Sequence, residues 1–234
     1  EWTPIFILAW SDGTLEDVTD TYGLGNTTGW WNVVEAADFD NDGDMDLVAG
    51  NLGLNYKYKA TSIETFDVYA NDYDENGHLD IVLGYYQGDK QFPVRGLSCS
   101  SEQIPVIKKK FKNKYNDFAQ ATLIDIYGSR DLKDGIHYKA QVFSSLYIEN
   151  LGNKNLKTSD LPFEVQSSSF NSMIITDFNE DGHLDIIAGG NQFNAEVETP
   201  RNDACYGWLL KGDGHGNFDY LDYSQSGLYV PYDI

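Results

Sequence analysis

The sequence predicts an all-β fold of repeated four-stranded antiparallel units, because two kinds of internal repeat alternate along it. The first kind reads strand, acidic glycine loop, strand, and occurs at residues 33–51, 66–84 and 173–191. The second kind is a tight hairpin, at residues 6–18, 146–153 and 208–218. The strands are short and rich in β-branched and aromatic residues, and the turns hold residues that tolerate positive φ. One repeat of each kind makes a four-stranded unit.

Radial repetition of such units is the propeller solution to exposed sheet edges, so we expect a β-propeller-like array of blades. Composition agrees, because the 234 residues include 16 Tyr, 12 Phe, 5 Trp and 22 Gly. No apolar run is long enough for a membrane span. The N-terminal residues 1–4 have no signal-peptide character, so we interpret the chain as part of a longer, secreted protein whose signal is not in this chain.

The charge is strongly acidic, with 37 Asp and Glu residues against 16 Lys and Arg residues and a formal net charge of −21. A surface of this sign repels nucleic acid, which excludes that class of partner. Five aspartates fall within residues 38–46. Such a density is self-repelling unless a cation neutralises it, so part of the excess is expected to be metal-ligand carboxylate.

The acidic loops have the spacing of calcium sites. Side chains at loop positions 1, 3 and 5 can point inward together, Gly at position 6 permits the reversal, position 7 offers its carbonyl and a carboxylate at position 9 closes the shell. The expected ligands of three Ca²⁺ sites are Asp38, Asp40, Asp42, Asp44 and Asp46 in loop one, Asp72, Asp74, Asn76, His78 and Asp80 in loop two, and Asp177, Asn179, Asp181, His183 and Asp185 in loop three.

At position 7 the ligand is the main chain, so we expect the side chains of Asp44, His78 and His183 to lie in solvent. The loops are not EF-hands, because the Glu at position 12 is missing and strands flank them. The alternative is a set of acidic β-turns that bind no metal.

The run from Asp38 to Asp46, followed by Leu47-Val48-Ala49-Gly50-Asn51, resembles the FG-GAP/VCBS repeat of integrin α-subunit propellers and many secreted bacterial proteins. The run Gly29-Trp30-Trp31-Asn32 and a helical insert at about 99–139 resemble a bacterial surface subgroup related to cartilage acidic protein. The resemblance implies one calcium-binding propeller-type domain over residues 1–234. Family rings have about seven blades and this chain has about four, which implies a fragment, an open arc, or a half that pairs with another copy.

The helical insert carries an apolar face and a basic face. Its apolar residues recur at helical spacing, at Ile104, Ile107, Phe111, Tyr115 and Phe118, after a capping box at Ser100 and Gln103. Its basic residues are Lys108, Lys109, Lys110, Lys112 and Lys114. This predicts either a solvated helix packed on the propeller or a basic surface that docks an anionic ligand such as a uronic polysaccharide.

Two tryptophans and two cysteines leave alternatives open. Adjacent strand residues face opposite ways, so one of Trp30 and Trp31 is expected in the core while the other could bind a ligand. Cys99 and Cys205 could form a disulfide or remain separate buried thiols.

The function we expect is a calcium-stabilised extracellular or cell-surface module for binding or adhesion, with a glycan or an extracellular protein as ligand. The alternatives are a calcium-dependent, lyase-like enzyme that degrades polysaccharides and a purely structural part of a larger surface protein. No nucleophile, phosphate-binding or zinc-protease motif occurs, and we assign no catalytic residue. A lyase would draw first on Arg95, His137, Arg201 or Tyr206.

Overall fold

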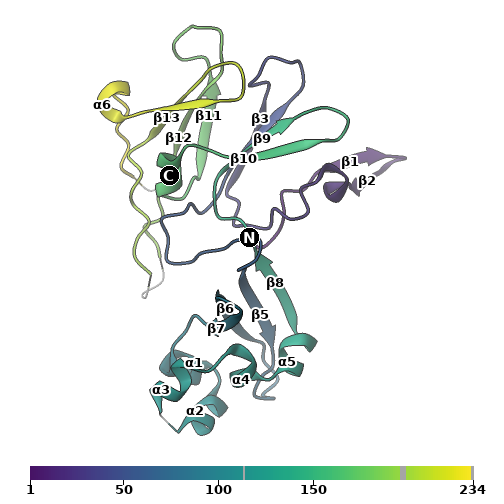
Figure 1. Ribbon diagram of the computed structural model, residues 1–234, viewed down its shortest axis with the longest axis vertical. Coiled ribbons are helices and arrows are strands. Elements are labelled where there is room, and N and C mark those ends of the chain that lie inside the picture. The colour runs from purple at the N-terminus through teal and green to yellow at the C-terminus, as the bar shows by residue number, and fades with distance from the viewer. Residues whose placement is uncertain (113, 196–198, 233–234) are drawn as a thin grey trace. The chain divides into compact units, whose positions relative to one another are not determined.

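The computed structural model describes residues 1–112, 114–195 and 199–232 and is mostly β, which confirms the predicted fold class (Figure 1). Its strands form three four-stranded antiparallel sheets and one two-stranded hairpin. The chain packs as two compact units, a larger one of residues 3–57 and 142–234 with Glu1, and a smaller one of residues 58–141 with Trp2. A single propeller-type domain with an insert at 99–139 stays a prediction.

The larger unit holds the hairpin and two of the sheets. The hairpin is β1 (Leu8–Ser11) with β2 (Thr14–Asp17). The first sheet is β3 (Val33–Ala37), β4 (Asp46–Gly50), β9 (Leu146–Asn150) and β10 (Leu156–Asp160). The second is β11 (Ser172–Thr176), β12 (Asp185–Gly189), β13 (Trp208–Gly212) and β14 (Phe218–Leu221). Three short helices are η1 (Thr19–Tyr22), η2 (Phe163–Ser167) and α6 (Tyr223–Ser226).

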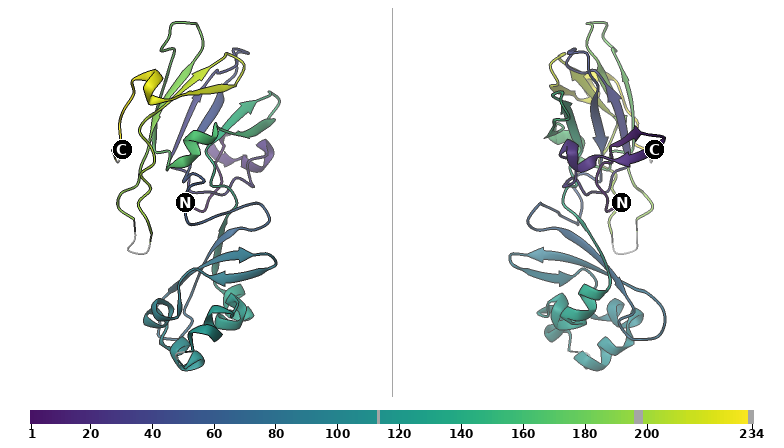
Figure 2. Two further views of the ribbon diagram at one scale, coloured as in Figure 1. Left: turned by 60° about the vertical axis from the view of Figure 1, so that its left-hand side comes forward. Right: turned by 90° about the vertical axis from the view of Figure 1, so that its right-hand side faces the viewer.

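Each of these two sheets is a blade-like meander made from one repeat of each kind. The acidic loop joins the first two strands, and the hairpin repeat supplies the last two. The two sheets lie side by side in Figure 1 and in the left view of Figure 2. A shared core of Phe39, Val48, Phe170, Ile186 and Trp208 joins them. Next to Val48 on β4, Ala49 packs into a second core, so this strand is buried on both faces.

The smaller unit has its own sheet, with strand order β7-β6-β5-β8. The strands are β5 (Phe66–Asn71), β6 (Asp80–Gln87), β7 (Lys90–Pro93) and β8 (Ile136–Ala140). Five helices follow β7, namely α1 (Leu97–Gln103), α2 (Pro105–Phe111), α3 (Tyr115–Ala119), α4 (Leu123–Tyr127) and α5 (Ser129–Asp134). They pack on Tyr69 and Val82 of the sheet. The order departs from the meander because β8 returns to the free edge of β5.

The expected continuous helix over residues 100–118 is broken in two places, and its predicted capping box is not formed. Ile104, with φ −125 and ψ 87, lies outside the helical region before Pro105, and Lys112 has φ 50, which ends α2. Ser100 lies inside α1, and the capping box forms instead at Thr122 with Asp125 at the start of α4. Ile107 and Phe118 are buried as predicted, whereas Tyr115 is exposed.

The smaller unit interrupts the first sheet between β4 and β9, which still pair in register, with Leu47 opposite Ile148. Asn51, fully buried just after β4, holds this junction. Its Nδ2 donates to the carbonyls of Val142 (3.0 Å) and Ser144 (3.2 Å), and its Oδ1 accepts from the amides of Trp30 and Leu52. The side chain therefore fastens the returning chain to the end of β4.

Asn191 does the same work after β12, where its Nδ2 donates to the carbonyl of Cys205 and its Oδ1 accepts from the amide of the same residue, both at 3.0 Å. The Asn that ends each of these two repeats is thus a clamp that brings the third strand to the second. Its amide satisfies buried main-chain groups that no strand reaches.

Replacing Asn51 with Ala should lower the free energy of unfolding by about 2–4 kcal/mol, because several buried main-chain groups lose their partners. The measurement is denaturant unfolding followed by tryptophan fluorescence. Asn26→Ala is the matched control, since Asn26 is exposed, and its effect should stay within about 0.5 kcal/mol. Equal stability of the two variants would contradict the clamp.

Candidate metal centre in the acidic loops

All three acidic loops fold the same way. The carboxylate at position 1 accepts from the amide of the position 6 glycine, with Asp38 to Gly43 at 3.2 Å, Asp72 to Gly77 at 2.8 Å and Asp177 to Gly182 at 2.8 Å. The carboxylate at position 9 accepts from the amide at position 2, with Asp46 to Phe39 at 3.3 Å, Asp80 to Tyr73 at 3.1 Å and Asp185 to Phe178 at 3.0 Å. These bonds bring the carboxylates at both ends of each loop onto one turn.

The main chain reverses through two positive φ values in each loop. Position 4 has φ 62 at Asn41 and 59 at both Glu75 and Glu180, and the glycine two residues later has φ between 86 and 97. No atom lies within 4 Å of a Cβ built on Gly43, Gly77 or Gly182. The glycine is therefore required for its backbone conformation and not for space.

The position 9 carboxylates are buried, and in the larger unit they also tie strands together. Asp46 accepts from the hydroxyl of Tyr147 (2.6 Å) and from the amide of Asn150 (2.8 Å) on β9. Asp185 accepts from the amide of Gly212 on β13 at 2.9 Å. The sequence indicated only a metal role for these residues, because contact with the third strand is not visible in the loop motif.

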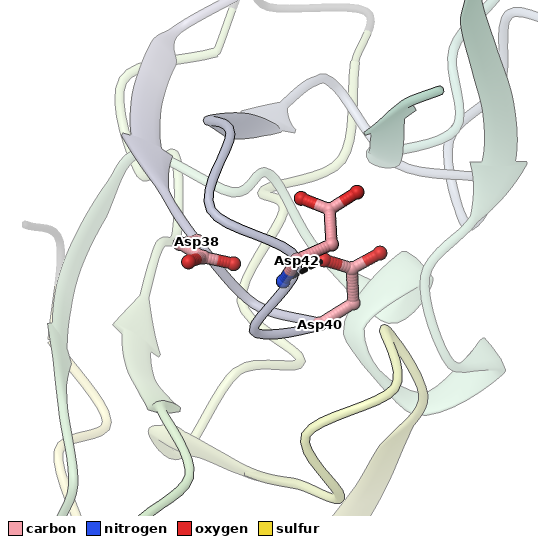
Figure 3. Close-up of side chains that lie close together, drawn as sticks. All are labelled: Asp38, Asp40 and Asp42. Atoms are coloured by element: carbon pink, nitrogen blue, oxygen red, sulfur yellow. Dashed lines mark hydrogen bonds between the residues drawn. The ribbon is translucent and has the colours of Figure 1, made fainter. Parts of the chain in front are cut away.

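Loop one gathers carboxylate oxygens that the protein does not satisfy. Single oxygens of Asp38, Asp40 and Asp42 lie within 4.8 Å of one another. Figure 3 shows these three side chains on the loop. Oδ1 of Asp38 and Oδ1 of Asp44 are buried and have no hydrogen-bond partner. Asp44 is half-buried, so the prediction of a solvated side chain is wrong for this residue. Desolvation and the neighbouring carboxylates raise the pKa of Asp40 and of Asp44. A hard cation that prefers oxygen ligands would bind these unpartnered oxygens and neutralise the charges beside them.

Loop two repeats this arrangement in the smaller unit. Asp72, Asp74 and Asp80 bring carboxylate oxygens within 4.8 Å of one another. Oδ1 of Asp74 is buried without a hydrogen-bond partner. Burial first, and then the charges of Asp74 and Asp72, raise the pKa of Asp80. Loop two can therefore hold the same kind of ion as loop one.

Loop three contains a cation from the chain itself. Nζ of Lys211, on β13, lies 3.0 Å from Oδ2 of Asp181. This hydrogen bond is the main cause of the lowered pKa of Asp181, and it raises the pKa of Lys211. The amide of Asn179 donates to the same Asp181 oxygen at 2.9 Å. Among the described residues, the loop forms no cluster of three acidic side chains like those of loops one and two.

The two histidines at position 7 differ from each other. His78 is exposed, as expected. His183 is half-buried and its Nδ1 is buried without a hydrogen-bond partner, so the prediction of a solvated side chain is wrong for this residue. The imidazole lies against Gly214, where an added Cβ would come within 2.2 Å of Nδ1. In both residues the main-chain amide donates to the side chain at position 5.

Trp30 and Trp31 are both half-buried. The Trp30 ring meets Phe143 edge-on at a centroid distance of 5.4 Å. The Trp31 indole donates to the carbonyl of Thr27 at 2.8 Å and packs against the core of Leu24. Contact of either ring with a ligand stays a prediction. Cys99 and Cys205 do not form a disulfide.

The four residues considered for catalysis lie in different surroundings. His137 points Nε2 at Oδ2 of the buried Asp67, 3.2 Å away, and Arg95 bonds Gln103. Both belong to the smaller unit. In the larger unit, Arg201 pairs with Asp203, and Tyr206 stacks on Tyr229.

Comparison with known protein families finds an FG-GAP-like repeat at residues 3–49, which span the first hairpin, loop one and most of β4. No curated protein is significantly similar to the chain. The repeat fits an extracellular binding or structural module and is typical of extracellular proteins. None of the helices in the described ranges has the length and apolar character of a membrane span.

Lys211 should weaken calcium binding at loop three, because its ammonium group competes for Asp181. We expect calorimetric titration with Ca²⁺ to show two stronger sites and one weaker site. Lys211→Gln should strengthen the weak site by up to about fivefold, the range of a partly exposed ion pair. Lys114→Gln is the matched control, because Lys114 makes an exposed ion pair with Asp117 at 3.6 Å, and both residues belong to the helical segment outside the loops. Three equal sites in the parent chain would contradict this prediction.

Proposed function

We propose that the chain is a calcium-stabilised extracellular or cell-surface module for binding or adhesion, with a glycan or an extracellular protein as ligand. The observation that carries the calcium part is the set of buried carboxylate oxygens without partners in loops one and two. Hard cations with oxygen ligands fit these oxygens, and the millimolar affinity typical of extracellular modules fits loops of this kind.

In loop one, Asp38, Asp40, Asp42 and Asp46 would hold the ion with their side chains and Asp44 with its carbonyl. In loop two the corresponding residues are Asp72, Asp74, Asn76 and Asp80, with the carbonyl of His78. In loop three they are Asp177, Asn179, Asp181 and Asp185, with the carbonyl of His183. The bound ion supplies positive charge where the first two strands meet. Calcium would therefore stabilise the sheets and leave ligand binding to other surfaces.

The FG-GAP-like repeat supports an extracellular location, since such repeats are typical of extracellular proteins. The acidic surface supports a partner other than nucleic acid, because a net charge of −21 repels phosphate backbones. A purely structural role in a larger surface protein remains the alternative that needs no ligand.

A lyase-like activity is a second candidate, and the contact between Asp67 and His137 favours it. The Asp67 side chain is 2% exposed and the His137 side chain 42% exposed, so a buried carboxylate orients an imidazole that solvent can reach. The Tyr69 ring stacks on the imidazole at 4.3 Å. A carboxylate that fixes an accessible imidazole is the arrangement of a general base.

Calcium should raise the melting temperature relative to EDTA by several degrees, because ligand at about 100 times its Kd adds about 2.7 kcal/mol per site. The measurement is thermal unfolding by circular dichroism. Asp38→Asn keeps an acceptor for the Gly43 amide but removes a ligand charge, so it should reduce the calcium effect without lowering the melting temperature in EDTA. Asp89→Asn, at an exposed turn, is the control. Identical melting with and without calcium would refute the proposal of occupied sites.

A polysaccharide panel tests the binding function. The calcium-loaded chain should be retained on at least one immobilised polymer without releasing shorter, unsaturated chains. Release of such chains, lost in His137→Gln, would favour the lyase instead. A chain neither retained nor active would favour the structural role or a protein partner.

A further inference from the structure

The smaller unit contains an open cleft of about 360 Å³. It lies between the β6–β7 hairpin, the turn that leads into α1, and α3. Its walls include Tyr85, Phe92, Arg95, Tyr115 and Asn116. This volume falls at the small end of the range of about 300–1,000 Å³ for ligand pockets, which suits a monosaccharide unit or another small group.

Three aromatic rings line the cleft and are not part of the buried core of the unit. Tyr85 and Phe92 face each other across β6 and β7, with ring centroids 6.3 Å apart. Tyr115 is 60% exposed, and its hydroxyl lies 3.3 Å from Oγ of Ser98. Aromatic rings at an accessible surface offer flat apolar faces together with a polar edge, and such faces can bind the apolar side of a sugar ring.

Arg95 is the charged residue among those that line the cleft. It is exposed and makes no ion pair with any described residue, whereas Arg130 and Arg201 are each paired with an aspartate. Its side-chain hydrogen bond runs from Nη1 to Oε1 of Gln103, at 3.2 Å. The other N–H groups of its planar fork match a carboxylate, to which arginine binds with two parallel hydrogen bonds.

The positive charge of the whole chain gathers in the unit that contains this cleft. Residues 58–141 hold 11 of the 16 Lys and Arg residues but only 12 of the 37 Asp and Glu residues. Their formal charge is therefore −1, against −20 for the rest of the chain. Lys108, Lys109, Lys112 and Lys114 are exposed, while Lys110 bonds the carbonyls of Asp125 and Ile126. An anionic ligand would thus meet least repulsion at this unit.

We propose that the cleft binds an acidic sugar residue, with the carboxylate on Arg95 and the sugar ring against Tyr85 and Tyr115. Asn116 also lines the cleft, and its side-chain amide would bond the hydroxyls of the sugar ring. This inference rests on the binding function proposed above and names its site and ligand class. A sugar acid uses the aromatic walls and the guanidinium together, whereas an acidic peptide would use the guanidinium alone.

The test is calorimetric titration of the calcium-loaded chain with trigalacturonate and with its carboxyl-reduced, neutral counterpart. Trimers of guluronate and glucuronate, each with its own reduced counterpart, extend the panel. At least one acidic trimer should bind, and its reduced form should bind about tenfold or more weakly, as expected when a hydrogen-bonded charged group is lost. Arg95→Gln should weaken binding of the acidic trimer by a similar factor and abolish the preference for the acidic over the neutral trimer.

Arg130→Gln is the matched control, because Arg130 is an exposed arginine of the same unit outside the cleft, and it should bind like the parent chain. Tyr115→Ala, at a residue whose side chain is mostly solvent-exposed, should weaken binding of the acidic trimer several-fold. If Arg95→Gln unfolds, perturbation of the Arg95 Nε and Tyr115 resonances by the trimer in the parent chain decides the same question.

Four results would overturn the inference: no binding of any acidic trimer, equal binding of acid and neutral forms, unchanged binding by Arg95→Gln, or equally tight binding of hexaglutamate. If binding is selective for the acidic trimer but Arg95→Gln leaves it unchanged, the binding function stands and its site lies outside this cleft. Failure of every polymer in the polysaccharide panel would instead remove the glycan-binding function itself.

Discussion

Carboxylate repulsion at the acidic loops is the constraint on which the rest of the structure depends. Each of these loops joins the first two strands of a repeat, so those strands pair only if the negative charge of the loop carboxylates is neutralised or stabilised by hydrogen bonds. Main-chain amides do part of this, because the position 6 and position 2 N–H groups each bond a carboxylate in all three loops. Carboxylate oxygens remain without partners in loops one and two, whereas Lys211 lies beside Asp181 in loop three. We propose that a bound cation neutralises the remaining charge in the first two loops and that the lysine does so in the third.

The buried aspartate at position 9 links the loop to the sheet. Asp46 reaches β9 through Asn150, and Asp185 reaches β13 through Gly212. The Asn clamps at the other end of the second strand, Asn51 and Asn191, hold the third strand from its start. In the first sheet, side chains fix both ends of the pairing between β4 and β9. The two strands therefore keep their register although 95 residues separate them in the sequence. An insertion can therefore be accommodated there, and it carries most of the positive charge of the chain.

Local repeats made the strands, loops and hairpins predictable. The Asp spacing and the glycine at position 6 specify a turn within nine residues, and tertiary contacts do not override it. The capping prediction chose the wrong pair, Ser100 and Gln103, although Thr122 and Asp125 also have the spacing of a capping box at the start of an apolar helix. The break at Ile104 follows from Pro105, which disfavours helical geometry in the residue before it.

Contacts between distant segments could not be predicted in the same way. Pairing of β4 with β9 depends on chain closure around an entire folded unit, and no local pattern encodes it. The position of Lys211 beside Asp181 arises from the register of β12 with β13, where a one-residue shift would turn the lysine away. The cleft around Arg95 likewise depends on how broken helices pack against the β6–β7 hairpin.

Anomalous X-ray diffraction from crystals grown with calcium would test the central claim most directly. We expect strong anomalous peaks inside loops one and two, at about 2.3–2.6 Å from the aspartate oxygens, including Oδ1 of Asp38 and Oδ1 of Asp74. Loop three should show a weaker peak or the Lys211 ammonium group in its place. Absence of peaks from loops one and two at millimolar calcium would contradict the claim that a cation contains the charge of these loops.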